Sequence, residues 1–167
     1  MAITRHITPC LWFDNQAEEA AAYYTGIFPN SRITKVTHYG SAGFEVHKRS
    51  AGSVMTVVFE LDGQPFTALN GGPAFMFNEA VSFEVGCANQ EEIDRYWEKL
   101  SAGGDPKAQQ CGWLKDRYGV SWQIVPDNME EIFRESDSPG ANRAMEAMLK
   151  MKKLDIAELR RAYDGAA

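Results

Sequence analysis

Two amide side chains, Asn70 and Gln123, lie in or next to apolar stretches that are predicted to be strands. An amide group donates and accepts hydrogen bonds but has no proton to lose near neutral pH, so it can orient a substrate but is a poor general acid or base. If Gln123 faces a binding surface, the alternation of side chains along a strand places Ser121 on the same surface. We predict that the ligand-binding residues are Phe13, Asn70, Ser121 and Gln123.

The candidate acids, bases and nucleophiles lack partners in the sequence. Glu60 and Glu84 lie among apolar residues, where burial would raise the pKa of the carboxyl group and make it a base, but strand alternation also allows both to face solvent. A nucleophilic Cys10 needs a base, and the nearest histidine in the sequence is His6. We therefore name no catalytic residue, and whether the protein is an enzyme stays open.

Aromatic residues make up 11% of the chain. They can line a cup that stacks on a flat or apolar ligand, or they can fill the core between sheet and helices, and the sequence leaves both readings open. The aromatic residues concerned are Trp12, Phe13, Phe66, Phe75, Phe77, Trp113 and Trp122.

The composition of this 167-residue chain excludes several classes of protein. Its formal net charge of −6 provides no basic stripe for nucleic-acid phosphates. No apolar run approaches the ~20 residues that span a membrane, and the first residues do not resemble a signal peptide. Three scattered cysteines without a CxxC pair fit a reducing compartment. We expect a cytoplasmic protein that binds neither nucleic acid nor membrane.

The chain contains an internal repeat. Residues 8–19 and 82–93 share a strand, an Asn-Gln pair and an acidic helix, and Asn15 and Asn89 lie 74 positions apart (89 − 15). This pattern indicates two copies of one module, with a ligand expected in the concave surface between them. We expect Asp14 or Asn15 to cap the first helix.

The hydrophobic pattern predicts an α+β fold of paired βαβββ modules over residues 1–127. Repeat one covers about 5–73 and repeat two about 78–127, with one strand of the second repeat short around Lys107. Strands are predicted at 6–13, 33–39, 54–61, 64–69, 80–86, 109–114 and 120–125, and helices at about 14–27 and 89–101.

The remaining residues, 128–167, are predicted to form a helical tail. An apolar stripe in this tail indicates packing on the protein's own domain or on a partner subunit. The stripe consists of Met145, Met148 and Leu149, and the helices are expected at 129–134, 141–152 and 154–163.

Several longer motifs carry a family resemblance. They lie at 8–13 (TPCLWF), 59–66 (FELDGQPF), 68–73, 96–100, 111–116, 118–123 and 147–156. These motifs resemble the PhnB-like branch of the vicinal oxygen chelate superfamily, which includes the glyoxalase and bleomycin-resistance proteins. The branch is often labelled 3-demethylubiquinone-9 3-methyltransferase-like. The resemblance covers nearly the whole chain and implies a cupped mixed sheet and a homodimer.

Metal-using relatives in this superfamily place His, Gln or Glu on four strands around one divalent ion. Alignment of helix starts and turns puts these positions at Pro9 or Thr8, at Leu69 or Asn70, at Ala80 beside Glu79, and at Gln123; His6, His38 and His47 lie elsewhere. We therefore expect no metal and no cofactor. A weak oxygen-ligand site formed by Glu79, Asn70 and Gln123 is the alternative.

The methyltransferase label is not supported by the motifs. A Rossmann-type methyltransferase needs a glycine-rich turn between a strand and a helix, and the turns at 13–16 and 86–89 lack a GxG pattern. Our leading hypothesis is a metal-independent protein that binds and sequesters a small molecule. The alternatives are a metal-dependent lyase, isomerase or dioxygenase, and the methyl-transfer enzyme that the label suggests.

Overall fold

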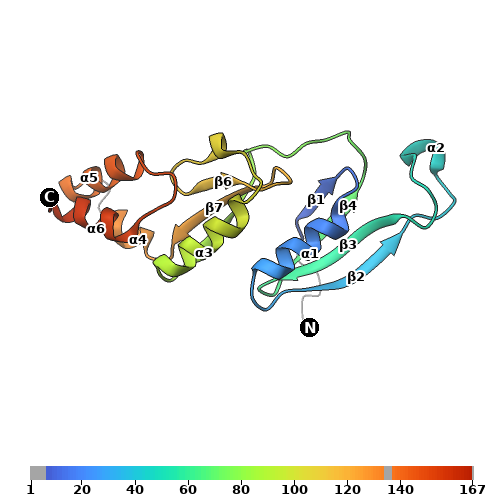
Figure 1. Cartoon of the computed structure of the whole chain (residues 1–167), viewed down its shortest axis with the longest axis horizontal. Helices are drawn as coiled ribbons and strands as arrows, with labels where there is room; N and C mark the ends of the chain where they lie inside the picture. Colours follow the sequence, from blue (N-terminus) through green and yellow to red (C-terminus); the bar gives the residue numbers. More distant parts are fainter. Residues whose placement is uncertain (1–6, 134–136, 167) are drawn as a thin grey trace. The chain divides into compact units, whose positions relative to one another are not determined.

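The protein divides into two compact units, Met1–Met76 and Phe77–Ala167. The structure is a computed structural model that describes residues 7–133 and 137–166; the expectations for His6 and Arg134 fall outside these ranges. Each unit contains a sheet with a helix packed against it (Figure 1). Within the described ranges, no helix combines the length and the apolar character needed to cross a membrane.

The first unit follows the predicted β-α-β-β-β order, with a short helix added between its second and third strands. In its sheet, with strand order β1-β4-β3-β2, β1 runs parallel to β4 and the other neighbours are antiparallel. Tyr24 and Phe59 are fully buried and stack between helix and sheet. The elements are β1 (Cys10–Phe13), α1 (Ala17–Ile27), β2 (Arg32–His38), α2 (Phe44–His47), β3 (Val54–Leu61) and β4 (Gln64–Asn70).

The start of α1 is held by a side chain from β4, and the expectation of a cap from Asp14 or Asn15 was wrong. The residue at the cap position, Gln16, makes no capping hydrogen bond with its side chain. Instead the backbone N–H of Ala17 donates to Oδ1 of Asn70 (2.8 Å). This bond satisfies one of the N–H groups that a helix leaves unpaired at its start. Asp14 accepts a hydrogen bond from Arg49 (2.8 Å).

The second unit has a smaller sheet than predicted. Its strand order is β5-β7-β6, with β5 parallel to β7 and β6 antiparallel to it. A 3-10 turn replaces the strand expected around Lys107, because Pro106 lacks an N–H for strand pairing. Cys111 (φ 52°) and Gly112 (φ 85°) then break the strand expected at 109–114. The elements are β5 (Ser82–Cys87), α3 (Gln90–Ser101), η1 (Pro106–Ala108), β6 (Trp113–Lys115) and β7 (Ser121–Pro126).

The tail forms α4 (Met129–Phe133), α5 (Pro139–Met148) and α6 (Ile156–Asp164). The segment before α6 is bonded to the second unit's own chain: the N–H groups of Cys111 and Gly112 donate to the carbonyls of Met151 and Lys152. Leu154 in this segment is fully buried. Contact of the tail with a partner subunit stays a prediction.

Candidate functional site

One face of the β5–β7–β6 sheet packs against α3, and the opposite face carries polar side chains. Leu114, Trp122 and Ile124 are at most 2% exposed on the α3 side. Since successive side chains of a strand alternate, the residues between them lie on the opposite face. We call this opposite face the polar face. The strand register arranges its side chains in two rows: Ser82, Ser121 and Lys115 in the first, and Glu84, Gln123 and Trp113 in the second.

Ser121 has an unusual environment on this face. Its side chain is buried, with 2% exposure, and its Oγ has no hydrogen-bond partner among the described residues. A buried hydroxyl group without a partner is destabilising, and most such groups in folded proteins find one. The hydroxyl of Ser121 therefore has an unmet hydrogen-bonding capacity, which a water molecule or a ligand could satisfy.

Gln123 and Ser82 are linked across the polar face. The Nε2 of Gln123 donates to the Oγ of Ser82 (2.9 Å). This bond fixes the amide plane, and it leaves the Oε1 of Gln123 without a hydrogen-bond partner in the described part of the chain. Trp113 lies opposite Gln123 on β6 and is half-buried. The row thus places a fixed amide next to a residue with an indole ring.

A lysine completes the first row. Lys115 lies directly opposite Ser121 and forms an ion pair with Glu79, which precedes β5. The side chain of Lys115 is 23% exposed, whereas that of Glu79 is 64% exposed. The hydrogen bond from Lys115 lowers the pKa of Glu79, so this carboxylate is ionised at neutral pH.

The turn between β6 and β7 fixes the orientation of these residues. Asp116 is buried, and its Oδ1 accepts hydrogen bonds from the backbone N–H groups of Tyr118 (2.8 Å) and Val120 (3.1 Å). Its Oδ2 accepts from the indole Nε1 of Trp122 (2.8 Å). Because Trp122 is held on the α3 side, Ser121 and Gln123 lie on the polar face.

The structure places the four predicted ligand-binding residues in two separate pairs. Ser121 and Gln123 lie on the polar face of the second unit. Phe13 and Asn70 are register partners in the first unit, 3% and 6% exposed, on the α1 side of their sheet. The amide of Asn70 accepts from Ala17 and donates to the carbonyl of Val54 (3.1 Å). Its hydrogen bonds are therefore made within its own unit.

Three residues of the polar face were not among the sequence candidates: Ser82, Trp113 and Lys115. Alternation along one strand relates Ser121 to Gln123, but the neighbours across the sheet depend on register. Register here follows from the Asp116 turn and from the parallel pairing of β5 with β7. Parallel pairing joins residues far apart in the sequence, so alternation alone could not reveal these neighbours.

Comparison with known proteins identifies the family. The family model of 3-demethylubiquinone-9 3-methyltransferase matches residues 5–125. The PhnB protein of Bacillus cereus is 35% identical, with 73% of this chain and 99% of that chain covered and a TM-score of 0.61. The chain belongs to this family. These findings confirm the predicted PhnB-like membership of the vicinal oxygen chelate superfamily and the predicted α+β fold class.

More distant structures share the fold alone. Protein PA1353 from Pseudomonas aeruginosa is 19% identical, covers 74% of this chain and 98% of its own, and has a TM-score of 0.56. The fosfomycin resistance protein FosX from Listeria monocytogenes is 15% identical, covers 77% of this chain and 96% of its own, and has a TM-score of 0.52. No curated protein sequence matches the chain.

The residues at the superfamily's metal-ligand positions do not fit a metal centre. Pro9, Leu69 and Ala80 have no metal-binding atom in their side chains, and Thr8, the alternative at the first position, offers only a hydroxyl group. The amide of Asn70 is engaged with Ala17 and Val54, and Glu79 is paired with Lys115. Within residues 7–133 and 137–166, no group of three or more His, Cys, Asp and Glu side chains is arranged to hold a metal ion.

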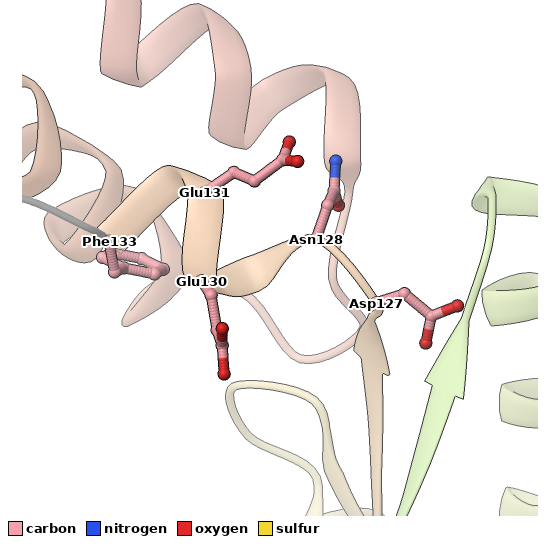
Figure 2. Close-up of a pocket in the computed structure, with 5 residues that line it drawn as sticks. All are labelled: Asp127, Asn128, Glu130, Glu131 and Phe133. Atoms are coloured by element: carbon pink, nitrogen blue, oxygen red, sulfur yellow. The ribbon is translucent and has the colours of Figure 1, made fainter.

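A pocket of about 670 Å³ lies beyond the end of β7. It is acidic, but Figure 2 shows that Asp127 points toward β5 while Glu130 and Glu131 project in different directions from α4. Carboxylates that do not converge cannot share one cation. We therefore assign no ligand to this pocket, which is lined by Asp127, Asn128, Glu130, Glu131 and Phe133.

Proposed function

We propose that the protein binds a small organic molecule on the polar face without using a bound metal ion. The observation that carries the proposal is the buried, unpartnered hydroxyl of Ser121 beside the fixed amide of Gln123. A few convergent polar groups next to an aromatic side chain are typical of small-molecule sites. Trp113 supplies that aromatic surface.

The chemistry of the polar face favours binding over turnover. Ser121 and Gln123 can hydrogen-bond a ligand but cannot act as acid or base at neutral pH. Glu84, the carboxylate of the second row, is exposed to solvent. A sequestering protein therefore fits these residues better than a lyase, an isomerase, a dioxygenase or a methyltransferase.

Phe13 and Asn70 stabilise the first unit in this proposal and do not contact the ligand. Both are buried on the α1 side of the first sheet, where Asn70 joins α1 to the chain at Val54. Unlike the hydroxyl of Ser121, the amide of Asn70 already has partners at both its oxygen and its nitrogen, and Phe13 is 3% exposed in the core. We therefore expect substitutions there to lower stability before they change binding.

The test is a fragment screen followed by nuclear magnetic resonance of the labelled protein. We expect binding fragments to shift the side-chain amide signal of Gln123, and Gln123→Ala to weaken that binding about tenfold, since a hydrogen bond in a desolvated site is lost. The matched control is Gln64→Ala, which removes an exposed amide from the first unit. Fragments that shift only signals outside the polar face would refute the proposal.

We also propose that the protein is a cytoplasmic homodimer. The family resemblance motivates the dimer, and exposed apolar side chains such as Val46 (87%) and Leu149 (55%) offer surface that a second copy could cover. Light scattering of the purified protein should give twice the 18.6 kDa mass of one chain. A mass of 18.6 kDa at micromolar concentration would contradict the dimer.

A further inference from the structure

We propose that the polar face binds the oxyanion of an organic acid, and that Glu79 pairs with Lys115 in place of this anion when no ligand is bound. The inference rests on the proposed function, because it concerns the same face. The ligand would be an anion, and the Glu79 carboxylate would compete with it for the ammonium group of Lys115.

The first row of the polar face consists of hydrogen-bond donors. Ser82, Ser121 and Lys115 lie side by side on β5, β7 and β6. Neighbouring strands are ~4.8 Å apart, so the two hydroxyl groups and the ammonium group can reach one carboxylate. An ionised carboxylate accepts hydrogen bonds at about four lone-pair sites and donates none. It is therefore complementary to a row of hydrogen-bond donors.

Both hydroxyl groups have a proton to give. Ser121 is 98% buried (100 − 2) and its Oγ lacks a partner in the described part of the chain. Ser82 accepts the hydrogen bond from Gln123, so its own proton is free to point at a ligand. An anion would satisfy both groups at once, whereas a neutral carbonyl group would gain less from the neighbouring ammonium.

The ion pair of Lys115 shows that this row already attracts a carboxylate. Glu79 comes from the segment before β5, whereas Lys115 lies on β6, so the pair joins the two sides of β7. Glu79 is mostly exposed, and exposed ion pairs are weak. A ligand carboxylate held also by Ser82 and Ser121 can therefore displace that of Glu79.

The test compares acids with their amides. We would titrate the whole protein with acetate, benzoate and phenylacetate, and with acetamide, benzamide and phenylacetamide, by nuclear magnetic resonance. We expect a carboxylate to bind more tightly than its amide. Glu79→Gln should tighten carboxylate binding about two- to fivefold by removing the competitor. Lys115→Gln and Ser121→Ala should each weaken it, Lys115→Gln by about tenfold.

The second ion pair of this unit provides matched controls. Lys153 and Asp94 pair at 2.5 Å with side chains 40% and 49% exposed. Lys153→Gln and Asp94→Asn make the same charge changes on α3 and its neighbouring segment, and they should leave carboxylate binding unchanged. If they change it as Lys115→Gln and Glu79→Gln do, net charge explains the effect and the inference is overturned.

The remaining outcomes separate the inference from the proposed function. Amides that bind as tightly as the acids, with shifts at Gln123, would overturn the anion inference and leave the small-molecule proposal standing. If no acid shifts the polar face while fragments from the screen do, the anion inference also fails alone. If neither acids nor fragments shift this face, both proposals fail.

Discussion

At the scale of single residues, Asn70 shows that a polar side chain in a strand can be structural. Its amide accepts from the first N–H of α1 and donates to the carbonyl of Val54 at the start of β3. Joining α1 to the start of β3 needs a side chain of this length that both accepts and donates hydrogen bonds. Its apolar surroundings in the sequence are equally typical of a ligand-orienting amide, so the sequence could not distinguish the two roles.

Asn70→Ala should therefore lower the free energy of unfolding by about 1–3 kcal/mol, because Ala17 N–H and Val54 C=O lose a buried partner. Urea unfolding of the variant measures this change. Asn15→Ala is the matched control, since Asn15 is exposed at the same turn and does not cap the helix. Equal losses for the two variants would contradict the assignment of the cap to Asn70.

The cysteines should differ in reactivity. Burial, with smaller contributions from the charges of Glu92 and Asp127, raises the pKa of Cys87 to about 12, and its side chain is 1% exposed. The raised pKa keeps this thiol protonated at pH 8, and only the thiolate reacts. A disulfide reagent at pH 8 should therefore modify exposed Cys10 first, although burial also raises the pKa of Cys10, and Cys87 only after unfolding.

Cys10→Ser should remove the fast phase of that reaction, as followed by absorbance. Modification of Cys87 in the folded protein at the rate of Cys10 would show that its surroundings open far more often than the packing of β5 against α3 suggests.

At the scale of elements, the sequence predicted correctly those strands and turns whose conformation depends on neighbouring residues in the chain. Strand β3 has the predicted bounds, and the Asp62–Gly63 turn has the positive φ angles (46° and 79°) of a tight hairpin. The strand expected around Lys107 is replaced by a 3-10 turn at Pro106, and the strand expected at 109–114 is interrupted by Cys111 in the left-handed conformation. The lysine beside Ser121 was missed because it depends on pairing across the sheet.

Alanine substitutions at two glycines, Gly104 and Gly26, would test how tightly these elements pack. A Cβ at Gly104 would overlap the backbone oxygen of Lys115, whereas a Cβ at Gly26 in α1 would meet no atom within 4 Å. Gly104→Ala should destabilise the protein by about 1–3 kcal/mol and weaken ligand binding by shifting β6. Gly26→Ala should stabilise it by about 0.5 kcal/mol. Thermal and urea unfolding measure both; a neutral Gly104→Ala would show that the turn before η1 can move away from β6.

At the scale of the whole molecule, the two units are copies of one plan that have diverged. The first keeps all strands of the predicted module, and the second has a turn in place of one strand and gains a helical tail. The metal-ligand positions that the family resemblance implies are divided between the two repeats. The first copy supplies Pro9 or Thr8 and Leu69 or Asn70, and the second supplies Gln123 and Ala80, which lies beside a Glu79 that is paired to Lys115.

The protein should accordingly retain well below one equivalent of metal when it is purified without chelator and offered Mn, Ni, Zn and Fe. One amide is a weak ligand for these ions, which prefer several charged or imidazole donors. Plasma mass spectrometry of the intact protein measures the retained metal, with Gln123→Ala and Gln64→Ala compared in parallel. One equivalent that disappears in Gln123→Ala but persists in Gln64→Ala would establish the metal-dependent alternative. In that case Glu79→Gln would test whether Glu79 leaves Lys115 to become a ligand: the variant would then lose the metal instead of binding carboxylates more tightly.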